Sequence, residues 1–182
     1  FQDAYARCRN MHLENDEVFQ NAKKVFATFG TELALKFLRT DGFAFRLGQV
    51  GTAKVFVEKL LRVFEKYCGK DPKLFAQIAC HGLFAHLLDA DFFEKMDEFF
   101  AEYCGNEPEL FARFACGSLF AHLFDDGFFR RLEQVRDEVF KGDQGALASA
   151  MCNSFCAALA NDKKSTNFRI RLEQVRDEVF KG

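Results

Sequence analysis

The amino-acid sequence repeats itself at intervals of 36 to 40 residues. Cys80, Cys116 and Cys152 are spaced by 36 residues, as are the chain's two prolines. The run RLEQVRDEVFKG occurs at residues 131–142 and again at residues 171–182. A fixed period of this length is typical of stacked helical arrays, which bind extended partners along one surface.

The Cys-Gly and Lys-Gly pairs that end each period divide the chain. We expect one continuous repeat domain, made of a partial N-terminal repeat or cap and four full repeats: residues 1–30, 31–69, 70–105, 106–142 and 143–182. Each repeat predicts a short helix, a small residue or two, a second short helix and a longer third helix. The predicted fold is therefore all-α, a right-handed α-solenoid of stacked 36–40-residue helical repeats.

Individual helices are predicted most clearly in residues 70–105 and 106–142. Asp71 is a good N-cap, and Pro72 suits the first helical position, where its missing N–H costs nothing. A second helix is predicted over residues 83–88, and the third helix of the next repeat over residues 128–140. Two insertions, near residues 49–52 and in the run NDKKSTN, are expected to extend loops on the same side of the array.

Composition favours dense apolar packing and argues against a polyanion-binding field. The chain has 25 phenylalanines and no tryptophan, and its net charge is −2. The second and third repeats carry an excess of acids, whereas the first carries seven Lys or Arg against four Asp or Glu. No run approaches the roughly 18 apolar residues that span a membrane. The acidic middle weakens a nucleic-acid function without excluding it.

The seven cysteines are odd in number and include no close C-x-x-C pair. We expect the repeated ones to be small packing residues in a reducing compartment. A repeated disulfide remains an alternative, because Cys68 and Cys80 share the 12-residue spacing of Cys104 and Cys116. Zinc held by Cys80, His81 and Cys68 is disfavoured because close ligand pairs are missing.

Motifs of catalysis are missing from the sequence. There is no glycine-rich phosphate loop, nucleophile elbow, metalloprotease helix or pair of catalytic carboxylates. The sequence therefore predicts a non-catalytic protein that uses no cofactor and no metal.

The stretch CGSLFAHLF, residues 116–124, resembles the second helix of the Pumilio (PUF) family of RNA-binding repeats. In that family a small residue, a stacking residue and a polar residue three positions further on face one base of single-stranded RNA. The resemblance implies the following nucleic-acid-binding residues, repeat by repeat: Gly42, Phe43 and Arg46; Gly82, Leu83 and His86; Ser118, Leu119 and His122; Ser154 and Phe155. The fourth repeat has Ala158 at the polar position.

Two other families are similar in part. The pairs at residues 81–82, 117–118 and 153–154 are similar to the base-reading pairs of TAL-effector-like DNA-binding repeats. The period and the degenerate apolar pattern are similar to those of octotricopeptide and heptatricopeptide repeats of organellar RNA-binding proteins. These resemblances also imply a nucleic-acid partner.

Several of these residues also fit a purely structural role. His86 and His122 occupy equivalent places on mostly apolar helices, where a histidine is often partly buried. Lys163 and Lys164 lie in the polar insertion, where they would either contact phosphate or form a solvated loop.

Taken with the resemblance, the sequence predicts an intracellular RNA-binding module within a ribonucleoprotein or an organellar gene-expression complex. The alternative is a protein–protein scaffold whose concave face holds a peptide or a neighbouring subunit of a larger assembly. Because the chain begins at Phe1 without a methionine, we expect it to be either a mature fragment or a part of a longer protein.

Overall fold

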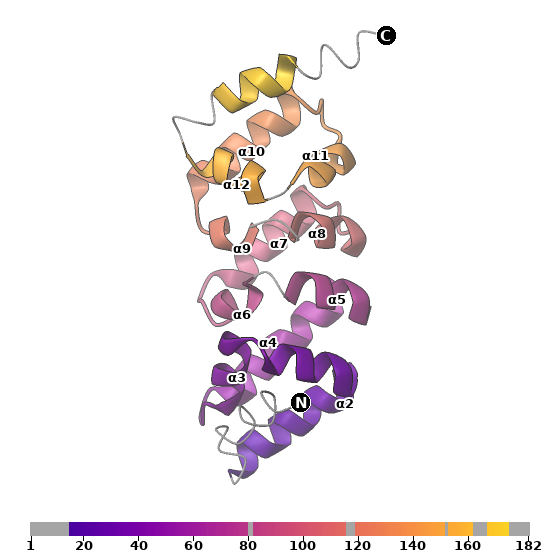
Figure 1. The fold of residues 1–182 in the computed structure, drawn as a ribbon, viewed down its shortest axis with the longest axis vertical. Helices are drawn as coiled ribbons and strands as arrows, with labels where there is room; N and C mark the ends of the chain where they lie inside the picture. Colours follow the sequence, from indigo (N-terminus) through magenta and orange to yellow (C-terminus); the bar gives the residue numbers. More distant parts are fainter. Residues whose placement is uncertain (1–14, 80–81, 116–118, 152, 162–166, 175–182) are drawn as a thin grey trace. The chain divides into compact units, whose positions relative to one another are not determined.

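The protein is built from helices joined by short turns (Figure 1). The computed structural model describes residues 15–79, 82–115, 119–151, 153–161 and 167–174, and no β-strand occurs in these ranges. The predicted all-α class is confirmed for this part of the chain. The chain divides into two compact units, here named the N-terminal unit (residues 1–92) and the C-terminal unit (residues 93–182).

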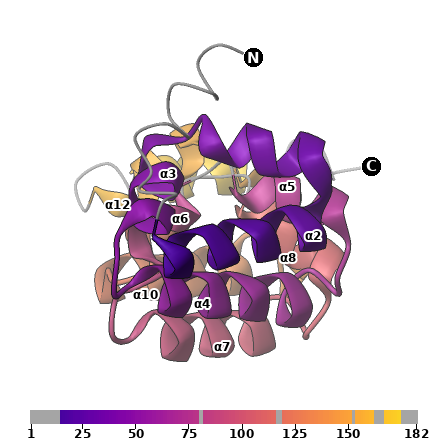
Figure 2. The same cartoon turned by 90° about the horizontal axis from the view of Figure 1, so that it is seen from below.

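The helices described in the N-terminal unit are α2 (Asp16–Leu38), α3 (Asp41–Gly48), α4 (Ala53–Lys66), α5 (Pro72–Ala79) and α6 (Leu83–His86). In Figure 2, α2 lies alongside α4, and α3 packs against both of them. Helix α2 is kinked at Gly30, whose φ of 75° is readily adopted only by glycine. The repeat boundary expected between residues 30 and 31 lies at this kink.

Phenylalanine rings form the core of the N-terminal unit. Ring centroids 4.8 to 6.3 Å apart connect seven side chains, namely Phe29, Phe37, Phe43, Phe56, Phe64, Phe75 and Phe84. Most of these pairs meet edge to face, the geometry that the ring quadrupole favours. The phenylalanine excess in the sequence is therefore a packing feature here.

The helices described in the C-terminal unit are α7 (Phe92–Glu102, whose first residue is the last of the N-terminal unit), α8 (Pro108–Ala115), α9 (Leu119–His122), α10 (Asp126–Glu138), α11 (Gln144–Ala150) and α12 (Asn153–Ala160). Residues 167–174 are also helical. Helix α8 contacts α9 and α11, and α12 contacts α9 and α10. Buried apolar side chains from these helices, among them Phe111, Phe128 and Leu147, fill the interior.

One turn recurs every 36 residues with the same backbone geometry. It follows the third helix of three successive repeats, at residues 67–71, 103–107 and 139–143. Its two central residues are left-handed in every copy: Gly69 and Lys70, Gly105 and Asn106, Lys141 and Gly142. In each copy the second of these donates its N–H to a helix carbonyl six residues earlier at 3.0 Å. The period read from the sequence is therefore also present in the backbone.

The start of α5 agrees with its predicted capping residue. The Asp71 carboxylate accepts the N–H of Lys73 at 2.7 Å, so its predicted role as N-cap is confirmed. Some bounds were predicted wrongly. The second helix of that repeat ends at His86, and α10 runs from Asp126 to Glu138, two residues earlier than expected at both ends. The earlier start has a clear cause, since Asp125 caps α10 by accepting the N–H of Phe128 at 3.0 Å.

The insertion near residues 49–52 lies in the loop between α3 and α4. Residues 162–166 of the other insertion lie outside the described residues.

Candidate functional site

The four residues expected to stack on bases lie in the interior. Phe43, Leu83 and Leu119 are 0% exposed, and Phe155 is 5% exposed. Phe43 illustrates why, because its ring centroid lies 5.4 Å from that of Phe37 and 4.9 Å from that of Phe84. These short helices turn their stacking positions toward neighbouring helices. In this structure none of the four side chains is exposed for stacking on a base, and their role in binding stays a prediction.

The polar members of the expected row are half-buried and have partners nearby. The Arg46 guanidinium lies 5.8 Å from the centre of the Phe45 ring. His86 Nδ1 lies 3.0 Å from a carboxylate oxygen of Asp89. The His122 ring stacks on Phe128 with centroids 5.0 Å apart. The two histidines therefore make contacts within their own repeats, as the structural interpretation of these residues expects.

The remaining predicted positions divide into two groups. Gly42, Gly82 and Ser154 are exposed. Ser118, Lys163 and Lys164 lie outside the described residues.

The second helices also contain an exposed position that the sequence interpretation missed. Phe45 is 66% exposed, and the residues in register with it, Ala85, Ala121 and Ala157, are exposed as well. Aligning the four second helices would have singled out Phe45 as the one aromatic residue at a position otherwise held by alanine. Its exposure, however, depends on which helix face meets the core.

Two of the repeated cysteines, Cys68 and Cys104, lie among the described residues and agree with the expectation that they are packing residues. Cys68 and Cys104 are buried and form no disulfide. Burial, with a smaller contribution from Asp71, raises the pKa of Cys68 to about 12, and burial also raises the pKa of Cys104. Cys80 and Cys116, their partners in the alternative disulfide scheme, lie outside the described residues. Within the described ranges no group of three potential ligands is placed to hold a metal ion.

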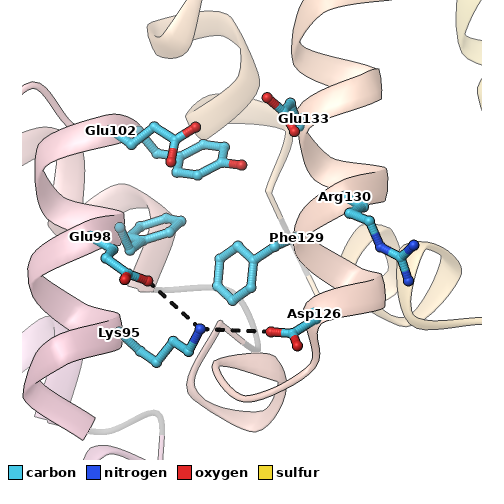
Figure 3. Close-up of a pocket in the computed structure, with 9 residues that line it drawn as sticks. Lys95, Glu98, Glu102, Asp126, Phe129, Arg130 and Glu133 are labelled. Carbon is cyan, nitrogen blue, oxygen red and sulfur yellow. Dashed lines mark ion pairs between the residues drawn. The ribbon is translucent and has the colours of Figure 1, made fainter. Parts of the chain in front are cut away.

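A groove lies between α7 and α10 in the C-terminal unit, with a volume of about 250 Å³ (Figure 3). Residues at helical spacing on facing sides line it: Lys95, Glu98, Phe99, Glu102 and Tyr103 on one side, and Asp126, Phe129, Arg130 and Glu133 on the other. Phe99 and Tyr103 are almost fully buried and stack on each other, with centroids 5.0 Å apart. Phe129 is half-buried and projects between the two helices (Figure 3). The groove therefore has an aromatic floor.

Carboxylates outnumber cations around this floor. The groove is lined by four carboxylates, Glu98, Glu102, Asp126 and Glu133, and by two cations, Lys95 and Arg130. Lys95 crosses one end of the groove, with its Nζ 3.7 Å from both Glu98 and Asp126 (Figure 3). Arg130 points its guanidinium away from the groove in the same view. The interior of the groove is consequently acidic.

Arg136 lies beside the groove and contacts Glu102 and Glu133, which line it. Its guanidinium lies 5.2 Å from the centre of the Tyr103 ring. It bridges the two helices, 3.4 Å from Glu102 on α7 and 3.5 Å from Glu133 on α10, and bonds Asp137 more closely at 2.7 Å. This last hydrogen bond raises the pKa of Arg136 and lowers that of Asp137. Arg136 stays charged and holds one rim of the groove.

The environment of Tyr103 favours the protonated form of its hydroxyl. Burial, reinforced by the negative charge of Glu102, raises the pKa of its hydroxyl above the ordinary value of 10.0. The phenol therefore stays neutral at physiological pH. The groove offers an aromatic surface and carboxylate oxygens, which are groups that bind a ligand.

Comparison with known proteins adds no assignment. No family model, curated protein or solved structure matches the chain. Among the helices that the structure describes, none has the length and apolar character needed to cross a membrane.

Proposed function

We propose that this chain is a non-catalytic binding module in which the repeats stack as a right-handed α-solenoid, and that its ligand is a segment of a partner protein. The recurring turn supports stacked repeats, because equivalent backbone geometry every 36 residues lets successive repeats pack in the same way. Cys68 and Cys104 are buried and form no disulfide, which supports a reducing compartment.

The groove between α7 and α10 is the reason for proposing a protein ligand and not RNA. An aromatic floor with a carboxylate rim attracts cations and apolar side chains, whereas it repels the phosphates of RNA. We propose that the groove is one contact point within a larger protein assembly.

RNA binding within a ribonucleoprotein remains a second candidate, favoured by one observation. Phe45 is largely exposed and has the Arg46 guanidinium beside it, an arrangement that offers a base both a stacking surface and a positive charge. This pair lies in the N-terminal unit, in a repeat with seven Lys or Arg against four Asp or Glu. It supports RNA contact at Phe45 in place of Phe43.

Both candidates can be tested in one experiment on the whole chain. Twelve-residue peptides are selected from a random display library, synthesised with a fluorophore and titrated by anisotropy beside a labelled 20-nucleotide oligouridylate. We expect selected peptides to bind and oligouridylate to bind weakly even at low salt.

The RNA candidate predicts a different pattern in this titration. Tight oligouridylate binding that weakens as salt rises, and that is lost when Arg46, His86 and His122 are all changed to alanine without loss of melting temperature, would favour RNA. A single change, Phe45→Ala, should then weaken binding as well, since stacking on one aromatic side chain is worth about 1–3 kcal/mol.

The stacked arrangement has its own test. Deleting residues 143–182 should leave the helical circular dichroism signal per residue nearly unchanged while exposing an apolar face that promotes aggregation. Complete loss of helix would indicate a single globular core and contradict the solenoid.

A further inference from the structure

We propose that the groove between α7 and α10 is a docking site for one arginine side chain of an extended partner segment. This assignment rests on the proposed function and makes it specific, because it names the chemical group that enters the groove.

The size of the groove fits a single side chain. Its volume of about 250 Å³ lies below the range of roughly 300–1,000 Å³ that is usual for pockets that enclose drug-sized ligands or cofactors. Its two walls are successive turns of α7 and α10, so the groove runs along the helices and is open to solvent (Figure 3). A long, thin side chain suits this shape better than a compact ligand.

The charge of the groove selects a cation. Glu98, Glu102, Asp126 and Glu133 face Lys95 and Arg130, and including Arg136 and Asp137 at the rim leaves the same excess of two carboxylates. Three of these carboxylates have side chains more than half exposed, at 59% for Glu98, 53% for Glu102 and 52% for Glu133. Their oxygens are therefore within reach of a ligand.

The floor selects an arginine among the cations. Phe129 is half-buried and offers part of its ring to the groove, where the flat guanidinium and the alkyl stem of an arginine can both lie against it. The chain itself contains an example at the rim, since Arg136 lies over Tyr103 while contacting Glu102 and Glu133. A second guanidinium in the groove would find the same combination of ring and carboxylates.

Lys95 would then compete with the incoming arginine for the carboxylates of the groove. Its ammonium group is shared between Glu98 and Asp126 at 3.7 Å each, a distance too long for strong hydrogen bonds. An incoming arginine that contacts Glu98 must share this carboxylate with Lys95. Removing the charge of Lys95 should therefore tighten binding.

The experiment uses the whole chain, labelled with nitrogen-15, and three capped peptides: GAARAAG, its lysine counterpart, and the same peptide with citrulline in place of arginine. Citrulline keeps nearly the shape of arginine without the charge. We expect the arginine peptide to shift amide signals of α7 and α10, and to bind about tenfold more tightly than the citrulline peptide, because hydrogen bonds between charged groups are worth about 1.5–3 kcal/mol. The lysine peptide should fall between them.

Three variants sharpen the result. The double change Glu98→Gln with Glu133→Gln should weaken arginine-peptide binding about tenfold. Its matched control, Glu65→Gln with Glu109→Gln, removes the same charge from two exposed carboxylates outside the groove and should change binding less than twofold. Lys95→Gln should strengthen binding severalfold, a gain that a misfolded variant would not show.

Specific outcomes would overturn the assignment. It fails if the citrulline or lysine peptide binds as tightly as the arginine peptide, or if the control pair weakens binding as much as the groove pair. It also fails if the shifted signals lie outside α7 and α10. If library-selected peptides bind without any basic residue, the proposed protein-binding function stands and the arginine site alone is wrong; if no peptide of either kind binds, both are wrong.

Discussion

The turn after α4 in the N-terminal unit and the turn after α10 in the C-terminal unit have the same backbone but different side chains packed beside them. In the first, the Phe64 carbonyl accepts the N–H of Lys70 at 3.0 Å; in the second, the Arg136 carbonyl accepts the N–H of Gly142 at the same distance. Phe64 is buried, with its ring 5.4 Å from that of Phe75. Arg136 stands in the equivalent position and makes ion pairs.

This difference shows how a repeat can change its chemistry without changing its fold. Left-handed residues and backbone hydrogen bonds define the turn, and neither depends on the side chain that begins it. The position can therefore hold a phenylalanine that packs or an arginine that reaches across to Glu102 on the preceding third helix. In the C-terminal unit, this arginine contacts two carboxylates that line the acidic groove.

The largest expected effect on stability is that of replacing Phe64, the apolar residue of the two. Phe64→Ala removes a ring that contacts Phe29 and Phe75, and should lower the free energy of unfolding by about 3–5 kcal/mol. Urea denaturation followed by circular dichroism measures the change. A loss below about 1 kcal/mol would mean that Phe64 is not a core residue.

The shared backbone can be tested at its glycines. Gly69→Ala and Gly105→Ala place a side chain at a φ of 57° and should each cost about 1–2 kcal/mol, by similar amounts in the two units. Gly42→Ala is the control, because this glycine has an ordinary φ and its added methyl would lie 3.7 Å from Phe84. Unequal losses at Gly69 and Gly105 would show that the turns differ energetically despite their common geometry.

Replacing Arg136 should lower the free energy of unfolding less than replacing Phe64 does. Arg136→Ala removes a ring contact and three partly exposed ion pairs, and should cost about 1 kcal/mol at low salt. Because salt screens exposed charges, the difference from wild type should shrink in 1 M sodium chloride. A loss equal to that of Phe64→Ala would contradict the contrast between the two turns.

The smallest effect concerns pH. Arg136 lowers the pKa of Asp137 below its ordinary value of 3.8, so this carboxylate stabilises the folded state above that value and loses its effect as pH falls through the lowered pKa. The melting temperature of Asp137→Asn should therefore lie slightly below wild type at pH 7, and the difference should begin to shrink only as the pH falls below 3.8. A difference that does not shrink at all as the protein is acidified below that value would assign the effect to something other than this ion pair.

The sequence predicted much of the fold but little of the candidate site. Period, helix order and the Asp71 cap are local features, recorded in spacing and residue type, and the structure has them. The burial of the four stacking positions was not foreseen, because the resemblance gives an order of residues along a helix and not the face that packs. The groove was missed because it depends on contacts such as that of Arg136 with Glu102, residues 34 positions apart.

By itself, the sequence determined that the chain is helical and that its parts recur every 36 residues, since caps, glycines and apolar spacing act within a few residues of one another. The tertiary structure decided which side chains are accessible. Phe43 is buried and Phe45 is exposed, although they lie two residues apart on one helix, because α2 and α4 pack against one side of α3. It also brought the carboxylates of α7 and α10 together around Phe129, since only the packing of two helices places separate sequence segments on opposite walls of one groove.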